Sequence, residues 1–333
     1  MNSCDKVTNS INKSTNKPLI SLVITTYNGS SHIMMQLESL RLQTVQPNEV
    51  LLFDDLSTDN TTDIIRQYIQ LYQLTTWKLQ INSTRLGWKK NFMEGIKKAS
   101  GDLIFLCDQD DKWYPNKIEK MVDAISLNNC ILILSCDYNV VYEPGSIRSK
   151  VYKKNRRERN GLIAKYEFKT GFFMNPKPGC SYVLRKSFFD DVNDLWFEGA
   201  HHDEFLWLMA TIQDGAFFYN ETLMDYIRYC GNSSEIRFKD INMQMKNLIY
   251  IEKMLSQMNK YAKMNPDKVT RDKKKRIEKA LVWCNKRQIL MKTRNPIRWL
   301  LLMPWWGYYN STINCLSDLY LILFGKFKRN AIS

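Results

Sequence analysis

Residues 101–113 read GDLIFLCDQDDKW, an apolar run that leads into three carboxylates within four residues. The run from Asp102 to Cys107 is short and apolar, which predicts a buried strand. Asp108, Asp110 and Asp111 follow directly, and carboxylates this close repel one another unless a cation lies between them. The stretch therefore predicts a divalent metal site at the end of a strand, with a plain polar turn as the alternative.

Short apolar runs alternate with helical periodicity on both sides of this stretch. We expect strands at 19–25, 50–53, 77–81 and 130–136, because the segments between them place apolar residues three and four positions apart. This alternation over residues 19–137 predicts an α/β fold with a mostly parallel sheet and helices on both faces.

The carboxyl ends of these strands carry the polar residues of interest. Ligands bind beyond the carboxyl ends of the strands in sheets of this kind. Tyr27, Asp55 and the cluster 108–111 each follow an expected strand. We therefore expect these three segments to meet at one edge of the sheet.

The remainder of the chain gives three expected regions. Residues 1–18 are polar and predict a flexible N-terminal tail, residues 19–235 a catalytic domain, and residues 236–333 a basic and aromatic helical C-terminal extension. Within the catalytic domain, 138–178 is rich in Lys, Arg, Gly and Pro and predicts a long loop, either a solvated linker or a part of the substrate site. A strand at 180–185 and helices near 187–195 and 202–212 are expected after it.

Composition restricts the partners and the compartment. A net charge of +14 and a pI near 9.3 require an anionic partner, which a nucleic acid, an anionic lipid or a phosphorylated substrate would each provide. No nucleic-acid-binding signature is evident, so nucleic acid is not expected. The eight cysteines form no C-x-x-C pair, which favours a reducing, cytoplasmic environment over a disulfide framework or a zinc ribbon.

Five blocks of sequence, spread over about residues 19–235, occur together in this chain. They are SLVITTYN at 21–28, FDDLSTD at 53–59, RLG at 85–87 with NF at 91–92, the stretch 101–113, and HDE at 202–204. Together they resemble the family 2 glycosyltransferases of the GT-A fold, and most of all the rhamnosyltransferases of bacterial polysaccharide assembly.

The resemblance implies a role for each residue at the expected edge. Thr25 and Tyr27 would pack against a nucleoside, and Asp55 would accept a hydrogen bond from a pyrimidine base, for which an aromatic face and a carboxylate are suitable groups. Asp110, assisted by Asp108, would hold Mg²⁺ or Mn²⁺ against the diphosphate. The cation would neutralise charge on the departing nucleoside diphosphate.

A transfer to an acceptor hydroxyl also needs a group that takes its proton. By the same resemblance Asp203 is the expected base, at the start of a helix, and Glu204 is its rival because the two are neighbours on a first helical turn. His201 and His202 are expected to orient or flank this group rather than to act.

One block departs from the pattern of the family. Related enzymes often show Y-R-x-H-G-x-N after the base helix, whereas residues 227–232 here read IRYCGN. Arg228 would still pair with phosphate. Cys230 stands where the histidine is expected, so we assign this position no metal-binding role.

The expected activity is inverting transfer from a nucleotide-diphosphate sugar, with dTDP-rhamnose as the first candidate donor. A UDP-hexose or UDP-N-acetylhexosamine donor is the alternative within the same fold. From another class, a sugar-phosphate nucleotidyltransferase would share the sheet and the carboxylates. It would show a Gly-rich basic loop after the first strand, which residues 27–31 do not supply. A basic scaffold without activity would leave the carboxylates unexplained.

The C-terminal extension combines positive charge with aromatic residues. Residues 252–298 hold fifteen Lys or Arg against four Asp or Glu, and 296–327 is rich in Trp, Tyr and Leu. Pro304, Asn310 and Asn314 interrupt the apolar runs, so a spanning helix is not expected. A peripheral anchor on the anionic inner face of the cell membrane is expected, which would suit a lipid-linked saccharide acceptor. A helical cap or an oligomer contact is the alternative.

Overall fold

The computed structural model describes residues 17–146, 161–169, 177–229, 240–309 and 311–325. The chain divides into two compact units, which are described separately here. Unit 1 comprises Met1–Tyr166, Lys177–Asp194 and Asp214–Gly231, and unit 2 comprises Glu167–Pro176, Leu195–Gln213 and Asn232–Ser333. The expected boundary near residue 235 stays a prediction. Most of the expected N-terminal tail, and Cys230, lie outside the described residues.

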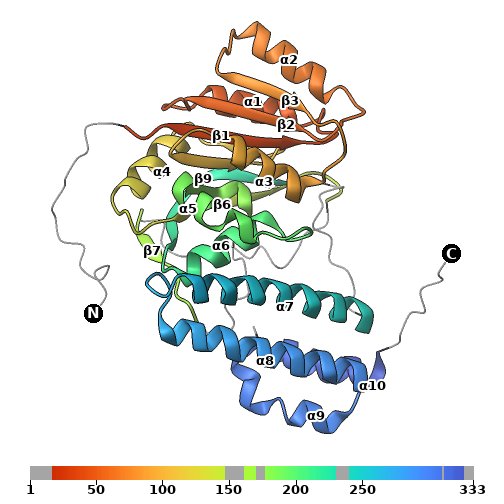
Figure 1. Cartoon of the computed structure of the whole chain (residues 1–333). Helices are drawn as coiled ribbons and strands as arrows, with labels where there is room; N and C mark the ends of the chain where they lie inside the picture. Colours follow the sequence, from red (N-terminus) through yellow and green to blue (C-terminus); the bar gives the residue numbers. More distant parts are fainter. Residues whose placement is uncertain (1–16, 147–160, 170–176, 230–239, 310, 326–333) are drawn as a thin grey trace. The chain divides into compact units, whose positions relative to one another are not determined.

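Unit 1 contains alternating strands and helices (Figure 1). In chain order they are β1 (Ile20–Thr26), α1 (Ile33–Arg41), β2 (Glu49–Asp54), α2 (Thr61–Leu71), β3 (Trp77–Ile81), α3 (Trp88–Lys98), β4 (Leu103–Cys107), β5 (Lys112–Trp113), α4 (Lys117–Ser126), β6 (Ile133–Tyr142), β7 (Ile163–Lys165), the 3₁₀ turn η2 (Gly179–Ser181), β8 (Tyr182–Arg185), α5 (Lys186–Val192) and β9 (Ala216–Arg228).

The strands of the described residues form one mixed sheet in the order β3-β2-β1-β4-β8-β6-β9-β5, with β7 paired to β9. The first four strands of this order run parallel to one another. β8 runs antiparallel to β4 and to β6. β6 and β9 are parallel, and β5 and β7 run antiparallel to β9. The parallel half therefore contains all three strand ends that the sequence marks as functional.

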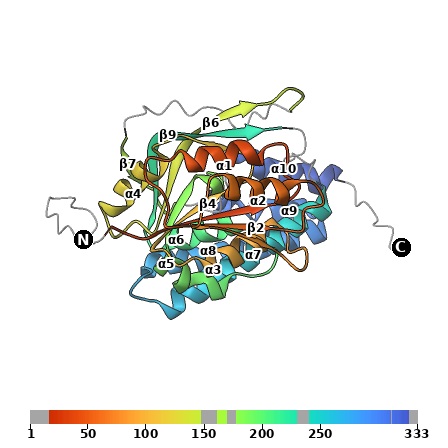
Figure 2. The same cartoon turned by 90° about the horizontal axis from the view of Figure 1, so that it is seen from above.

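Helices cover both faces of the parallel half, as alternation of the side chains along each strand requires. Leu22, Ile24 and Leu52 join the core cluster that also contains residues of α1, α2 and α4. α3 covers the opposite face, where a Cβ added at Gly95 would lie 2.7 Å from Val23 and 2.9 Å from Phe53. Only a residue without a side chain permits this approach of helix and sheet. Figure 2 shows α1 and α2 on one side of β2 and β4 and α3 on the other.

The expected alternation over residues 19–137 is confirmed, and strand β3 has the expected bounds. Two expectations on the later part of unit 1 are wrong. The strand expected at 130–136 begins at Ile133 and continues to Tyr142, and 138–178 is not one loop, because it also contains β7. β6 continues through polar residues because β9 pairs with it as far as Tyr142↔Arg228. The long strand β9 itself was not predicted.

Unit 2 is helical. Its elements are α6 (His202–Ile212), α7 (Ile241–Met264), α8 (Arg271–Thr293), α9 (Pro296–Leu300), the 3₁₀ turn η4 (Met303–Tyr308) and α10 (Thr312–Phe324). This confirms the expected helical C-terminal extension. Among the described residues, no helix combines the length and the apolar content needed to cross a membrane.

A buried ion pair joins the helices of unit 2. The guanidinium of Arg287 on α8 contacts the carboxylate of Asp318 on α10 at 2.7 and 2.9 Å. The same carboxylate accepts hydrogen bonds from the hydroxyl of Tyr309 at 2.8 Å and the side chain of Gln244 at 3.1 Å. Asp318 is fully buried, and all of its protein donors come from other elements. This network fixes α10 against α7 and α8.

Candidate nucleotide and metal site

The ends of β1, β2 and β4 meet at one edge of unit 1, as expected. β1 pairs in parallel with β2, with Thr26 opposite Asp54, and with β4, with Ile24 opposite Cys107. The segments that follow the three strands therefore leave the sheet side by side. They hold Tyr27, Asp55 and the turn of residues 108–111.

The main chain of Tyr27 is held by the turn after β4. Its N–H donates to Oε1 of Gln109 at 2.9 Å, and its carbonyl accepts from Nε2 of Gln109 at 3.2 Å. The guanidinium carbon of Arg85 lies 3.6 Å from the centroid of the Tyr27 ring. Thr25, the other residue expected at the nucleoside, is buried at the end of β1. Arg85 thus joins the aromatic residue at this edge, although no role was expected for it from the sequence.

Asp55 organises the loop between β3 and α3. It is buried, and its carboxylate accepts hydrogen bonds from the N–H groups of Leu86 at 2.7 Å and Gly87 at 2.8 Å. The side-chain amide of Asn82 donates to the same carboxylate at 3.0 Å and to Oδ1 of Asn91 at 2.9 Å. The blocks 53–59, 85–87 and 91–92 are therefore one hydrogen-bonded structure. Contact of Asp55 with a base stays a prediction.

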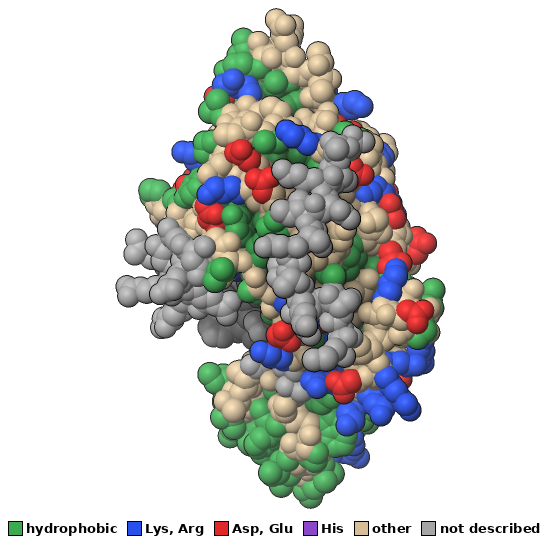
Figure 3. All heavy atoms as spheres, turned by 90° about the vertical axis from the view of Figure 1, so that its left-hand side faces the viewer, with side chains coloured by type: hydrophobic (Ala, Val, Ile, Leu, Met, Phe, Trp, Pro, Cys, Tyr) green, Lys and Arg blue, Asp and Glu red, His purple; other side chains and the backbone are tan. Residues whose placement is uncertain are grey.

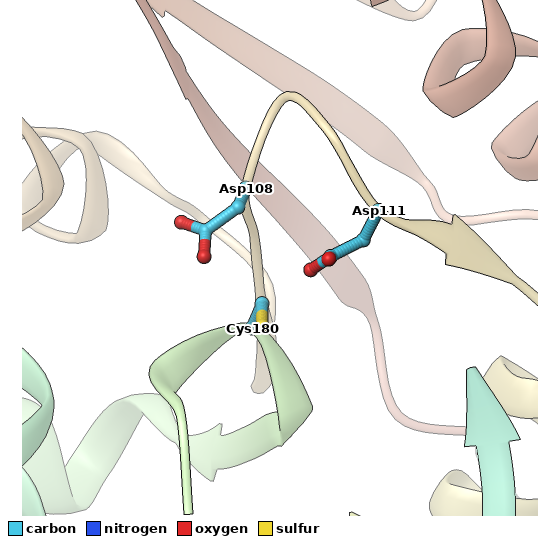
Figure 4. A group of neighbouring side chains, drawn as sticks. All are labelled: Asp108, Asp111 and Cys180. Carbon is cyan, nitrogen blue, oxygen red and sulfur yellow. The ribbon is translucent and has the colours of Figure 1, made fainter. Parts of the chain in front are cut away.

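The acidic turn brings together Asp108, Asp111 and Cys180, whose potential ligand atoms all lie within 4.8 Å of one another. Figure 4 shows the two carboxylates coming from the two ends of the turn between β4 and β5, with Cys180 of η2 beside them. Asp111 is fully buried, and its Oδ1 accepts from the N–H of Ile227 on β9 at 3.2 Å. Asp108 is an expected metal ligand, whereas Asp111 and Cys180 had no expected role as ligands.

Electrostatics in this cluster favour a cation. Burial, and then the charges of Asp108 and Asp110, raise the pKa of Asp111 well above its usual range. Burial followed by Asp111 and Asp108 likewise raises the pKa of the Cys180 thiol well above normal, so the thiol stays protonated. A divalent cation between the carboxylates would offset this repulsion and favour their ionised form, and carboxylate oxygens suit a hard cation such as Mg²⁺ or Mn²⁺. The residues present therefore fit the expected metal.

Asp110 lies in a second group of side chains beside this cluster. Burial raises the pKa of Asp110, while a hydrogen bond with Tyr229 and the nearby His32 and Arg228 act in the opposite direction. The ring of His32 stacks on that of Tyr229, with centroids 4.2 Å apart and planes 20° apart. Nε2 of His32 lies 3.0 Å from a carboxylate oxygen of Glu143. Tyr229, His32 and Glu143 were not expected at this site from the sequence.

Arg228 reaches this edge from the end of β9. Its guanidinium lies 5.8 Å from the ring centroid of Tyr226, and its carbonyl accepts from the N–H of Glu143 at 2.8 Å. The residue is largely buried. Its charge is close enough to Asp110 to influence that carboxyl. A contact of Arg228 with phosphate stays a prediction.

The two candidates for the base lie at the start of α6, in unit 2. Glu204 accepts a hydrogen bond from the hydroxyl of Tyr250 on α7 at 2.6 Å. Asp203 instead accepts from the main-chain N–H of Glu204 at 2.9 Å. His201 is the N-cap residue, and His202 is buried at the first helical position. The structure thus distinguishes the two carboxylates by their partners, and the role of base stays a prediction for Asp203.

Known proteins resemble this chain in sequence over about half of its length. The family model for glycosyl transferase family 2 matches residues 21–190. The dTDP-rhamnosyl transferase RfbG of Shigella flexneri is 33% identical over 165 residues, which cover 48% of this chain and 53% of RfbG. The aligned part thus spans about half the length of that relative.

Solved glycosyltransferases share the fold at low sequence identity. The TarS 1–349 structure from S. aureus, in complex with UDP, has a TM-score of 0.55 at 16% identity and covers 92% of this chain and 81% of its own. The mannosyltransferase PcManGT from Pyrobaculum calidifontis, in complex with GDP-Man and Mn²⁺, has a TM-score of 0.51 at 13% identity, with coverage of 92% and 79%. These similarities concern the fold, which is of the GT-A type. With half of its length matched by the family model, the chain belongs to glycosyl transferase family 2.

Proposed function

We propose that the protein is an inverting, metal-dependent glycosyltransferase with dTDP-rhamnose as its first candidate donor. The acceptor is a hydroxyl of a saccharide, carried on a lipid, in bacterial polysaccharide synthesis such as that of O-antigen or capsule. The observation that carries this proposal is the convergence of Tyr27, Asp55 and the carboxylates of 108–111 at the carboxyl edge of three parallel strands. The similarity to RfbG, a dTDP-rhamnosyl transferase, supports the rhamnosyl donor.

The residues of unit 1 bind the nucleotide-sugar donor. Thr25, Tyr27 and Asp55 bind the nucleoside, and Arg228 pairs with the diphosphate. Asp108 and Asp110 would hold Mg²⁺ or Mn²⁺, and the cation would supply positive charge opposite the nucleoside diphosphate. Asp111 supports Asp108, because the two carboxylates belong to the same cluster.

The reaction itself is a single displacement. The acceptor oxygen forms a bond to the anomeric carbon while the bond from that carbon to the phosphate oxygen breaks. The hydroxyl proton passes to the carboxylate of Asp203, and the bonding electrons leave with the nucleoside diphosphate. Attack from the side opposite the leaving group inverts the configuration of the anomeric carbon.

A UDP-hexose or UDP-N-acetylhexosamine donor is the second candidate. The TarS structure holds UDP, and a carboxylate such as Asp55 recognises the imide N–H of uracil and thymine equally well. The choice between the two donors therefore requires a direct binding measurement.

The decisive experiment is a panel of dTDP-, UDP- and GDP-sugars tested for thermal stabilisation with and without Mn²⁺. A ligand present at 100 times its Kd stabilises the folded state by about 2.7 kcal/mol. We expect dTDP-rhamnose to raise the Tm most, and the metal-dependent part of the shift to vanish in Asp108→Asn and Asp110→Asn. Absence of a Tm shift with every nucleotide would refute the proposed site. A larger Tm shift with UDP-sugars than with dTDP-rhamnose would identify a UDP-sugar as the donor.

A further inference from the structure

The exposed face of α10 is apolar. Its solvent-facing residues Ile313, Leu316, Tyr320, Leu323 and Phe324 are 48–74% exposed. The first four recur three, four and three positions apart, and Phe324 lies four positions after Tyr320, so all five form one stripe along the helix. The opposite face buries Cys315, Asp318 and Ile322 within unit 2. A surface helix of a soluble protein normally has a polar outer face. By contrast, α10 has apolar residues on its outer face as well as on its buried face.

α9 and η4 extend this apolar surface. Ile297, Leu300, Leu301, Met303 and Trp306 are exposed as well. Nε1 of Trp299 donates to the carbonyl of Cys315 at 3.0 Å, and its ring lies 5.5 Å from that of Trp306. These contacts join α9, η4 and α10. We call the exposed residues of these three elements the apolar tail surface. Figure 3 shows hydrophobic side chains gathered at this end of unit 2, with Lys and Arg side chains beside them.

The charges around the apolar tail surface are positive. Asp318 is the only acidic residue between Lys279 and Gly325 in the sequence, and it is fully buried in its pair with Arg287. Lys286, Lys292 and Arg298 are exposed. Nζ of Lys286 lies 5.0 Å from the ring centroid of Trp305, which places positive charge next to the aromatic residues.

We propose that the apolar tail surface docks on an anionic lipid bilayer. Its Leu, Ile and Phe side chains enter the boundary between headgroups and acyl chains, where Trp and Tyr residues are also favoured. The exposed Lys and Arg residues contact lipid phosphates. A symmetric contact with a second copy would instead place the same positive rim on both sides, where like charges repel. An anionic bilayer supplies the complementary charge that the chain lacks.

This inference goes beyond the proposed activity, because it concerns where the enzyme works rather than what it transfers. Binding to a bilayer would bring the protein to the surface on which a lipid-linked acceptor is held. It does not depend on the identity of the donor. The two proposals therefore fail separately, and each has its own measurement.

The test is co-sedimentation of the full chain with vesicles of 30% phosphatidylglycerol in phosphatidylcholine. We expect Leu316→Asp and Phe324→Asp each to weaken binding on the order of tenfold, because each loses the burial of a large apolar side chain. Leu71→Asp is the matched control, since Leu71 is an equally exposed apolar residue at the end of α2 in unit 1. Lys286→Glu with Lys292→Glu is expected to weaken binding to the anionic vesicles only, and added salt to do the same.

Light scattering and urea unfolding on the same preparations complete the test. An unfolding midpoint of Leu316→Asp close to that of the wild type would show that the lost vesicle binding is not a folding defect. Equal binding by Leu316→Asp and Leu71→Asp would overturn the inference. The inference would also be overturned if the wild type did not bind vesicles but formed a dimer that Leu316→Asp dissociates. The apolar tail surface would then be an interface between two copies of the chain.

Discussion

The side-chain amide of Gln109 pairs with both polar groups of the Tyr27 main chain, its N–H at 2.9 Å and its carbonyl at 3.2 Å. These two hydrogen bonds connect the end of β1 to the acidic turn that follows β4. The position of the expected nucleoside-binding residue is thus coupled to the position of the expected metal ligands. Gly29 lies against the same amide, where an added Cβ would be 2.3 Å from Oε1 of Gln109.

Gln109→Ala is therefore expected to lower both stability and nucleotide affinity. Two neutral hydrogen bonds contribute about 1–3 kcal/mol to the free energy of unfolding, which urea denaturation measures. Gly29→Ala is expected to have a similar effect, because its methyl group displaces the Gln109 side chain. If this mechanism holds, Gly29→Ala costs little in a protein that already carries Gln109→Ala. Additive losses in the double variant would show that the two residues act independently.

Asp203 and Glu204 are expected to differ sharply in their effect on transfer. The hydroxyl of Tyr250 donates to Glu204, and burial together with the charge of Glu204 raises the pKa of that phenol, so it remains a donor. Glu204 thus joins α6 to α7, which gives it a structural role, and Asp203 stays the proposed base. We expect Asp203→Asn to lower kcat by about 10²–10⁴-fold, the usual contribution of a general base, with the donor-induced Tm shift unchanged.

Glu204→Gln and Tyr250→Phe are the matched comparisons for this prediction. Both disturb the same hydrogen bond, so we expect similar and smaller losses of kcat from the two. A loss from Glu204→Gln as large as that from Asp203→Asn, with Tyr250→Phe near the wild type, would assign the base to Glu204.

The strands and the edge at which they meet could be predicted, because both depend on local sequence. The apolar runs before Tyr27, Asp55 and Asp108 have strand length, and parallel strands necessarily bring their carboxyl ends together. The prediction of one loop at 138–178 was wrong because the structure there depends on contacts distant in the sequence. Residues such as Asn139 are polar, and only their pairing with β9 keeps them in a strand.

The surroundings of the carboxylates could not be predicted, because their partners are distant in the chain. Asp111 accepts from the N–H of Ile227, 116 positions away, and His32 contacts Glu143, 111 positions away. No sequence pattern marks such pairs. Tyr229 stood within a block that departs from the family pattern at Cys230. The position of this aromatic residue beside Cys230 was the one sequence signal that pointed to Tyr229.

The buried pair of Arg287 and Asp318 is expected to be a major determinant of the stability of unit 2. Burial opposes the charged form of Arg287, but the carboxylate of Asp318 outweighs it and leaves the pKa of the guanidinium raised. Asp318→Asn keeps the shape of the side chain and removes its negative charge. The buried guanidinium of Arg287 then has no carboxylate to balance its positive charge. We expect the free energy of unfolding to fall by about 3–5 kcal/mol in urea denaturation.

The exposed pair of Arg276 and Asp272 on the same helix provides the control. Its guanidinium and carboxylate lie 2.9 Å apart in solvent. Asp272→Asn is expected to cost about 0.5 kcal/mol or less, because exposed pairs contribute little. Equal losses from Asp318→Asn and Asp272→Asn would mean that the buried pair adds nothing beyond a surface contact.

Stability below neutral pH is expected to depend on His202. Burial, and then the neighbouring His201, lower the pKa of the His202 imidazole from 6.5 to about 3 in the folded protein. Below about pH 6.5 the unfolded chain binds a proton at this position that the folded chain does not. Stability is therefore lost as the pH falls from 6.5 towards 3, by about 2 kcal/mol between pH 7 and pH 5.

Replacement of His202 by a side chain that does not titrate isolates this contribution. We expect the difference in unfolding free energy between pH 7 and pH 5, measured with urea, to be about 2 kcal/mol smaller in His202→Gln than in the wild type. His201→Gln is the matched control, since it removes an exposed imidazole next to the same helix and leaves the buried His202 in place. The same pH dependence in the wild type and His202→Gln would mean that His202 takes up its proton in the folded protein. In that case a polar partner, rather than burial, determines its charge.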